Sequence, residues 1–414
     1  MTRDNVLPLE GIRVADFCWV WAGPYCTMLL AALGAEVIKV EGYKRPDLIR
    51  RGTARWRVRD DPSMIEVKRV PGASFNTINM SKKSLALDLA TAEGRDLARR
   101  LVTISDVVVD NMRPGAMAAL GLGYEDLRNL RPDIIVLSSS SQGQKGPQSQ
   151  YEGFATIHQS IGGQAYITGY PDDGPSPGPS DTDIMNATTS ALTILAALYH
   201  REQTGEGQFI DYSQCEGVSS LIGELLLGYQ MNSEIPERAG NVHPVYAPHN
   251  LYRCWGVDRW LALEIHSDEE FSILARVIGK PELASDPRFA TIAARKKNEL
   301  ELNRIIEEWT RWRDRDWMVD ELCYAGLAAA PSQDYKDLYA DPHLQARDAF
   351  VTVDAPEVGQ LELAGIPWKN SSYEAFLRAA PLLGEHNEYV LKGLLGLSQA
   401  EIDDLQETTN DKMK

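Results

Sequence analysis

Two aspartates, Asp181 and Asp183, stand immediately ahead of an uncharged stretch, Ile184–Tyr199, whose residues favour one long helix. A carboxylate at a helix start commonly accepts hydrogen bonds from the unpaired amides of the first turn. The same carboxylate can also attack an activated acyl group, with nearby amides available to stabilise the oxyanion that develops. The sequence therefore predicts a helix cap here, a nucleophile, or both.

The segments around this helix alternate between strand-like and helix-like patterns. Strands are predicted at 12–17, 36–41, 84–89, 106–110, 134–137 and 209–213, and helices at 24–33, 91–102 and 217–229. Such alternation favours a mostly parallel sheet covered by crossover helices. We therefore expect an α/β protein with a Rossmann-like large domain that positions the two aspartates.

The second half of the chain predicts a smaller domain. Residues 143–179 are rich in Gly, Pro, Gln and Ser and are expected to form a loop region without a helix. Strands at 251–254 and 260–265, followed by charged helical segments at 269–324, indicate a small α+β domain. Strands at 328–331 and 350–353 are expected in the return to the first domain. The predicted division is 1–225 and 326–414 for the large domain and 226–325 for the small one.

Composition excludes several partners. The 42 Lys and Arg against 59 Asp and Glu give a net charge of −17, so neither nucleic acid nor an anionic membrane surface is an expected partner. The uncharged run 17–35 contains Gly23-Pro24 and is predicted to be a strand, a turn and a helix instead of a membrane span. The five cysteines are scattered without a Cys-x-x-Cys pair. We therefore expect a cytoplasmic protein with no disulfide framework and no metal.

Several catalytic motifs are absent from the sequence. It contains no Gly-x-x-x-x-Gly-Lys-Ser/Thr phosphate loop, no His-Glu-x-x-His and no Gly-x-Ser-x-Gly elbow. The pair Gly121 and Gly123 follows a helix-like stretch and is not continued as a dinucleotide fingerprint. Hydrolase, metalloenzyme and nicotinamide-dependent chemistry are therefore disfavoured.

Eight short phrases in a fixed order resemble the class III coenzyme A transferases, the family of formyl-CoA transferase and carnitine CoA-transferase. The phrases are PLEGIRVAD (8–16), AGP (22–24), LGAEVIKVE (33–41), KSLALDL (83–89), DNMRPG (110–115), ILAAL (194–198), TGEGQ (204–208) and GNVHP (240–244). The family's catalytic aspartate lies just ahead of the helix that ends in ILAAL. The resemblance therefore implies that Asp183 is the nucleophile and that Asp181 is its neighbour.

The reaction implied by this resemblance is a ping-pong exchange of coenzyme A between an acyl-CoA donor, with succinyl-CoA expected, and a carboxylic acid. It passes through an aspartyl anhydride and an aspartyl-CoA thioester on Asp183. Such a carboxylate must be ionised yet poorly solvated, and water must be excluded because an anhydride hydrolyses.

In similar proteins CoA lies along the ends of the large-domain strands. Carried over by motif, the implied contacts are Trp21, Ala22, Leu87, Asp88, Leu89, Ala90, Asn111, Met112 and Arg113. Leu87 and Leu89 are equally well explained as strand core. Gly42 stands where the family often has an arginine for the 3′-phosphate. Lys44 and Arg45 are expected to replace that arginine, with solvated loop charges as the alternative.

An aromatic phrase adjoins the implied CoA site. Phe17, Trp19 and Trp21 alternate and are predicted to share one strand face, with Tyr25 just beyond; a packed core strand is the alternative. An apolar or aryl acid is the expected acceptor. The phrase resembles the subunits of succinyl-CoA:benzylsuccinate CoA-transferase, which would imply anaerobic aromatic degradation. A cation–π cage for a carnitine-like trimethylammonium is the competing use of the tryptophans.

Three further expectations concern subtype and assembly. Formyl-CoA transferase has Gln where Trp21 stands and Tyr-Glu where Phe154-Ala155 stand, so oxalate is a disfavoured substrate. The resemblance also implies that Phe154 lines the substrate pocket. The related α-methylacyl-CoA racemases need a His-Asp pair, and their histidine also falls at Phe154, which disfavours that alternative. A non-catalytic subunit of a heteromeric transferase is the third alternative.

The small domain and the assembly also enter through the resemblance. Gly240, Asn241 and His243 are implied to belong to a loop near the active site that lines the substrate pocket, although a structural histidine is the more frequent outcome. The resemblance further implies an interlocked dimer of ring-like chains, formed with itself or with a homologous subunit.

Overall fold

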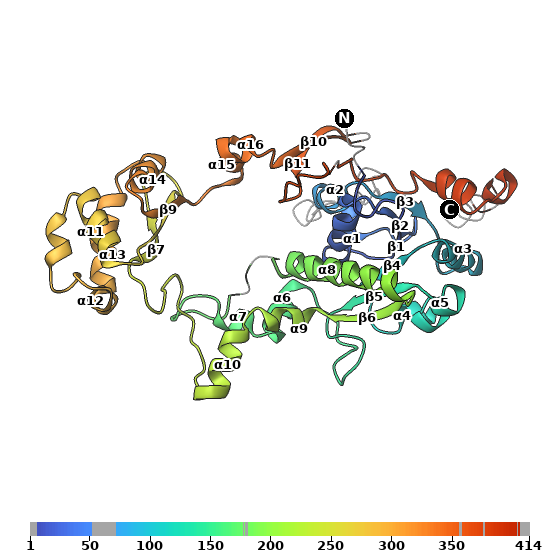
Figure 1. Cartoon of the computed structure of the whole chain (residues 1–414), viewed down its shortest axis with the longest axis horizontal. Helices are drawn as coiled ribbons and strands as arrows, with labels where there is room; N and C mark the ends of the chain where they lie inside the picture. The colour runs from blue at the N-terminus through green and yellow to red at the C-terminus, as the bar shows by residue number, and fades with distance from the viewer. Residues whose placement is uncertain are drawn as a thin grey trace, which may run out of the picture. The chain divides into compact units, whose positions relative to one another are not determined.

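The computed structural model describes residues 6–51, 72–176, 178, 181–355, 358–375, 377–403 and 405. The chain forms two compact units (Figure 1). The first contains Met1–Gln164, Pro177–Ser233 and Ala346–Lys414, and the second contains Ala165–Ser176 and Glu234–Gln345. The short segment 165–176 joins the second unit through backbone contacts, such as the 2.8 Å hydrogen bond from Gly240 N to Gly169 O. Such a long-range contact leaves no local pattern in the sequence.

A six-stranded parallel sheet forms the centre of the first unit. Its strands are β1 (Arg13–Asp16), β2 (Glu36–Glu41), β3 (Lys83–Ala86), β4 (Val107–Asp110), β5 (Ile135–Ser140) and β6 (Gln208–Ser213). They lie in the order β3-β2-β1-β4-β5-β6, which confirms the predicted α/β class. The order reverses between β1 and β4, and in such sheets the crevice outside the carboxyl ends of the two central strands is the usual binding site.

Helices cover both faces of this sheet (Figure 1). One apolar core packs α1 (Ala22–Ala32) and α8 (Asp181–Thr204) on one face. A second core packs α3 (Ala92–Thr103), α5 (Tyr124–Leu130) and the π-helix η5 (Tyr389–Leu394) on the other face. Thr91 caps α3 by accepting a hydrogen bond from Gly94 N, as expected for a threonine at a helix start.

The remaining elements of the first unit are short. They are η1 (Leu48–Arg51), α2 (Ala73–Ile78), α4 (Ala116–Ala119), α6 (Ala155–Ile161), α9 (Gln214–Ser220), α10 (Gly223–Asn232) and the antiparallel pair β10 (Phe350–Ala355) and β11 (Gly359–Ala364). The expectation of no helix in 143–179 is wrong, because α6 and α7 (Gln164–Ile167) lie there. The helix α6 packs against α8 and α9, so tertiary contacts stabilise a segment whose local composition disfavours a helix.

The second unit is an α+β assembly. Its antiparallel sheet contains β7 (His249–Arg253), β8 (Trp260–Glu264) and β9 (Ala328–Pro331). Its helices are α11 (Asp268–Val277), η4 (Pro281–Ser285), α12 (Ile292–Lys297), α13 (Glu299–Thr310), α14 (Arg315–Tyr324) and α15 (Tyr335–Ala340), and α16 (Pro342–Ala346) follows. The strand β9 pairs with β8, so the chain leaves this unit later than the sequence indicated. Among the residues described, none of the helices has the length and apolar character needed to cross a membrane.

Candidate active site

The loops after β1 and β4 are tied together at the carboxyl edge of the sheet. The Asn111 side chain donates from Nδ2 to Trp19 O at 2.7 Å and accepts from Trp19 N at Oδ1 at 2.9 Å. Gly23 lets α1 approach this contact, since a Cβ there would lie 2.5 Å from Cys18 Cβ and 3.1 Å from Asn111 Cγ. Trp21 and the first turn of α1 are therefore held beside the loop that begins at Asn111.

The predicted aromatic strand face is wrong. The strand β1 ends at Asp16, and Phe17 has 0% of its surface exposed in the core that faces α3. Trp19 and Trp21 lie in the following loop and are half-buried, and Tyr25 is half-buried in α1. The strand ends early because Asn111 takes both backbone groups of Trp19. Of the predicted pocket residues on this segment, Phe17 is therefore core.

The loops after β2 and β3 also adjoin each other. Leu87 N donates to Glu41 O at 2.8 Å, and Lys44 Nζ lies 4.0 Å from Asp88 Oδ2. Leu87 is buried in the apolar core and Leu89 packs against it, whereas Ala90 is exposed. These loops thus offer backbone groups and a lysine at the edge that also carries Trp21.

The other basic residues expected to bind phosphate are exposed. Arg45 is exposed, and the Arg113 side chain is 70% exposed, 4.0 Å from Glu152. Met112, beside it, packs against the core of the α3 face, and its amide donates to Asp110 Oδ1 at 3.1 Å. Arg113 and Lys44 therefore each form a long ion pair with an acidic residue, and a phosphate could replace that acidic partner.

The long helix α8 carries Asp183 to this same edge. Arg201, near its carboxyl end, pairs with Asp106 at 3.1 Å, and Asp106 directly precedes β4. The 24 residues of α8 span about 36 Å, against about 20 Å for the six residues of β5. The amino end of α8 therefore lies at the carboxyl edge of the sheet.

Asn186 fixes the start of α8 against β6 and α9. Its Nδ2 donates to Gln214 O at 3.3 Å, and its Oδ1 accepts from the Tyr212 hydroxyl at 2.9 Å. A Cβ at Gly217 would lie 2.2 Å from Asn186 Oδ1, so only glycine permits this approach. Asp183 lies three residues before Asn186 on the same helical face, so the contacts of Asn186 also hold the Asp183 backbone in place.

The two aspartates of this helix have different surroundings. Asp181 is exposed, and its Oδ1 accepts from Gln159 Nε2 at 3.0 Å and from Thr182 N at 2.9 Å. Asp183 is half-buried, and no hydrogen bond from any residue that the structure describes reaches its carboxylate. Burial, followed by the charge of Asp181, raises the pKa of Asp183 from the ordinary 3.8 to about 6. Asp183 is thus ionised at neutral pH but poorly solvated, as a carboxylate nucleophile requires.

We expect activity to fall below about pH 6 because protonated Asp183 cannot attack a thioester. Asp181→Asn removes the neighbouring charge, so the acid limb of kcat/KM should move down by about half a pH unit to one. Measuring kcat/KM from pH 4.5 to 8.5 tests this, with Glu125→Gln on α5 as an unchanged control. An acid limb near pH 4 in the unaltered protein, or an upward shift in Asp181→Asn, would contradict the prediction.

The predicted loop residues of the small domain are bonded within the second unit. Gly240 has a φ of +58°, where a side chain would collide with the Tyr170 ring. Asn241 Nδ2 donates to Asn250 Oδ1 at 3.1 Å. His243 Nδ1 accepts from Val245 N and Tyr246 N, each at 3.1 Å, so this histidine stabilises its own turn.

Phe154 precedes α6 with 67% of its surface exposed and offers no group for proton transfer. This placement gives the racemase alternative no base at that position. Across the described ranges, no group of three or more His, Cys, Asp and Glu side chains could hold a metal ion.

Two buried ion pairs lie behind the crevice, and the sequence pattern did not predict them. The ammonium groups of Lys39 and Lys82 have no exposed surface and pair at 3.0 Å with Asp47 and Asp16, respectively. A lysine between the apolar residues Ile38 and Val40 of the predicted strand is the signal that could have found the first pair. Lys82 had no such signal, because it precedes its strand.

Comparison with known proteins places this chain in a family. The sequence pattern of CoA-transferase family III matches residues 9–387. "Succinyl-CoA--D-citramalate CoA-transferase" of Chloroflexus aurantiacus is 36% identical over 402 residues, which cover 96% of this chain and 97% of that one. The beta subunit of "Succinyl-CoA--L-malate CoA-transferase" from the same organism is 36% identical over 411 residues, covering 97% and 98%. "Succinyl-CoA:mesaconate CoA-transferase" of Haloarcula hispanica is 35% identical over 408 residues, covering 96% and 99%.

A solved structure of the same kind of protein also resembles this chain. The crystal structure of a CAIB/BAIF family protein from Brucella suis superposes with a TM-score of 0.84 at 32% identity, covering 94% of this chain and 99% of that one. The chain belongs to CoA-transferase family III. It is therefore a CoA-transferase whose substrates are an acyl-CoA and a carboxylic acid, which confirms the predicted family and enzyme class.

Proposed function

We propose that this enzyme moves CoA from succinyl-CoA to a small dicarboxylic acid, with Asp183 as the nucleophile. The assignment of Asp183 as the nucleophile is supported by its half-buried carboxylate, which lies at the carboxyl edge of the sheet. Asp181 takes the hydrogen bonds from Gln159 and Thr182 and leaves Asp183 free to react. The retained carboxylate also speaks against a merely architectural subunit.

The proposed reaction has four steps that balance. The Asp183 carboxylate attacks the thioester carbonyl, the C–S bond breaks, and an anhydride and CoA thiolate result. The thiolate attacks the Asp183 carbonyl, which releases succinate and leaves an aspartyl-CoA thioester. The acceptor carboxylate then displaces the thiolate to form a second anhydride. Attack of the thiolate on the acceptor carbonyl releases the new thioester and regenerates the carboxylate.

Coenzyme A is proposed to lie along the loops after β1, β2, β3 and β4. Trp21 and Ala22 are held beside Asn111, and the Leu87 and Asp88 loop adjoins Lys44. Leu87 is core, so its contact would be through the backbone. The remaining proposed contacts are Arg45, Leu89, Ala90, Met112 and Arg113. Because the protein has a net charge of −17, the anionic cofactor needs local cations, which are Lys44, Arg45 and Arg113.

The acceptor is proposed to be a C4 or C5 dicarboxylic acid. The three relatives described above are named for D-citramalate, L-malate and mesaconate, and none of the three is named for an aryl acid. The expectation of benzylsuccinate and aromatic degradation therefore has no support from them. Trp19 and Trp21, both half-buried, keep an arylsuccinate as the chemical alternative.

An acceptor panel tests the proposal. The purified protein is incubated with succinyl-CoA and, separately, glutarate, L-malate, D-citramalate, mesaconate or benzylsuccinate, and each new thioester is measured by mass spectrometry. We expect one of the small dicarboxylates to exceed benzylsuccinate in kcat/KM by about a hundredfold, the discrimination that a shaped pocket can reach. A preference for benzylsuccinate over each of the small dicarboxylic acids would overturn this assignment.

The helix α10 supports a second proposal, that two chains associate. None of its residues is buried, and Leu226, Leu227, Tyr229 and Met231 are each more than half exposed. Apolar side chains exposed around a helix to this extent are expected to be covered by protein. We propose a dimer, formed with itself or with a homologous chain, since one relative is the beta subunit of a two-subunit enzyme. Analytical ultracentrifugation of the purified chain distinguishes a dimer formed with itself from a monomer, and co-expression with a homologous chain tests the other form.

A further inference from the structure

The loop between β1 and α1 contains a backbone conformation that its sequence disfavours. Val20 has a φ of +69°, in the left-handed region. A β-branched residue there collides with its own backbone and is a genuine outlier, and such strain persists only when surrounding contacts impose it. Val20 lies between Trp19 and Trp21, so its conformation determines where these two side chains point.

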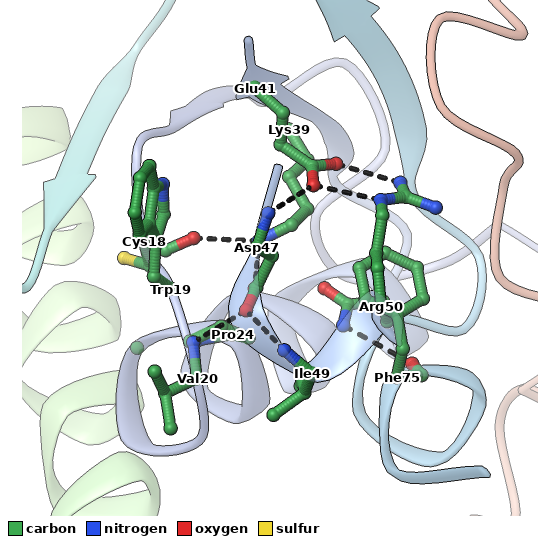
Figure 2. Close-up of polar contacts among 12 residues, drawn as sticks. Cys18, Trp19, Val20, Pro24, Lys39, Glu41, Asp47, Ile49, Arg50 and Phe75 are labelled. Atoms are coloured by element: carbon green, nitrogen blue, oxygen red, sulfur yellow. Dashed lines mark hydrogen bonds and ion pairs between the residues drawn. The ribbon is translucent and has the colours of Figure 1, made fainter. Parts of the chain in front are cut away.

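A buried carboxylate holds the strained residue (Figure 2). Asp47 Oδ1 accepts a hydrogen bond from Val20 N at 3.0 Å and another from Ile49 N at 3.2 Å. Its Oδ2 accepts from Lys39 Nζ at 3.0 Å, and the same ammonium donates to Cys18 O at 2.6 Å. The Lys39 and Asp47 side chains are both 0% exposed. One ion pair therefore bonds the loop both before and at the strained residue.

The ion pair is itself fixed by a second one. Asp47 N donates to Glu41 Oε1 at 3.1 Å, and Glu41 accepts from Arg50 Nε at 2.8 Å and Nη2 at 2.7 Å. The Arg50 guanidinium lies 3.7 Å from the centre of the Phe75 ring (Figure 2). Two positive and two negative side chains thus balance, and each buried carboxylate has several donors. Although burial opposes charge on Lys39, the carboxylates of Asp47, Asp16 and Glu41 raise its pKa, so it stays protonated.

We propose that Asp47, oriented by Lys39, is a positioning residue for CoA transfer: it holds Val20 in the left-handed conformation and thereby places Trp19 and Trp21 at the CoA site. This inference rests on the proposed CoA contacts at Trp21 and Ala22. Binding then begins from an ordered loop, and the substrate does not have to supply the free energy of ordering it. Without Asp47, the Val20 amide loses its partner and the strained φ is no longer imposed.

Rescue by glycine is the test, because glycine adopts a φ of +69° without steric cost. Asp47→Ala should lower kcat/KM for succinyl-CoA by about tenfold to a hundredfold, the population change that one such strained residue represents. Asp47→Ala with Val20→Gly should recover most of this loss. Asp47→Ala with Val20→Ala should not, since alanine still disfavours the left-handed region.

A matched control separates positioning from stability. Asp106 accepts hydrogen bonds from Arg131 and Arg201 at the opposite edge of the same sheet. Asp106→Asn should lower the Tm while leaving kcat/KM of the folded protein within about twofold. Activity is assayed at 15 °C so that destabilised variants stay folded. Near-UV circular dichroism at the same temperature verifies that each variant is folded. If Asp47→Ala fails to fold, Asp47→Leu combined with Lys39→Met takes its place, because it removes the acceptor of Val20 N without leaving a buried charge unpaired.

The outcomes are distinct. Unchanged kcat/KM in the folded Asp47 variant, or equal values for the glycine and alanine backgrounds, would overturn the positioning role. The Kd for free CoA, measured by calorimetry, should follow the same order of variants and needs no turnover. If the Kd for CoA follows this order of variants but the unaltered protein transfers CoA to none of the dicarboxylic acids, then the proposed acceptor fails while the positioning role stands.

Discussion

Asp183→Ala is expected to lose CoA exchange by about ten-thousandfold or more, the usual consequence of removing a covalent nucleophile. Each proposed intermediate is covalently bonded to the Asp183 carboxylate. No neighbouring group can therefore replace Asp183 unless the reacting carbonyl of the substrate moves. In the unaltered protein, incubation with succinyl-CoA followed by hydroxylamine should convert Asp183 to its hydroxamate. Peptide mass spectrometry locates that modification to a single residue.

Asp181 is the matched control for this trap. It lies two positions away on the same helix, is exposed, and accepts hydrogen bonds from Gln159 and Thr182. Asp181→Ala should still be modified at position 183 and should keep measurable exchange. Modification at Asp181, or exchange that survives in Asp183→Ala, would show that the nucleophile has been misassigned.

The same substitution site should show a trade between activity and stability. The folded-state pKa of Asp183 is raised to about 6 from 3.8, so ionisation of this half-buried carboxylate destabilises the fold. That cost is absent below about pH 4, grows between pH 4 and 6, and is complete above pH 6. Asp183→Asn should therefore raise the free energy of unfolding at pH 7.5 by about 1–2 kcal/mol and leave it unchanged at pH 3.8.

Asp16→Ala is expected to cost about 3–5 kcal/mol of unfolding free energy because it leaves the Lys82 ammonium buried without its counter-charge. Asp16 Oδ2 lies 3.0 Å from Lys82 Nζ and accepts from Thr27 Oγ1 at 2.7 Å, and both members of the ion pair are 0% exposed. Lys82 Nζ also donates to Pro24 O at 2.7 Å, so the start of α1 depends on this pair. Urea denaturation measures the loss.

Two comparisons make this prediction specific. Asp16→Ala combined with Lys82→Met should be more stable than Asp16→Ala alone, because the unpaired charge has been removed. Glu125→Ala, which breaks the exposed pair with Arg128 at 3.6 Å, should cost less than about 0.5 kcal/mol. A loss in Asp16→Ala no larger than that of Glu125→Ala would contradict the importance of the buried pair.

Local pattern was a good guide to the large sheet. The strand predicted at 36–41 has the same bounds in the structure, because its β-branched Val37, Ile38 and Val40 lie between Gly34 and Gly42. The long helix was found from its uncharged residues, although it begins at Asp181 and continues to Thr204. The helix α6 was missed, since its residues, ATIHQSI, have weak helical preference and are stabilised by α8 and α9.

The sequence alone determined the α/β class through local periodicity and the family through phrases in a fixed order, and this resemblance implied that Asp183 is the nucleophile. Only the tertiary structure shows that Asp181, and among the described residues not Asp183, accepts a side-chain hydrogen bond, because Gln159 comes from another helix. It also decided the buried pairs of Lys39 and Lys82 and the left-handed Val20. Such contacts join residues distant along the chain, and their free energy comes from excluding water around charges that are close only after folding.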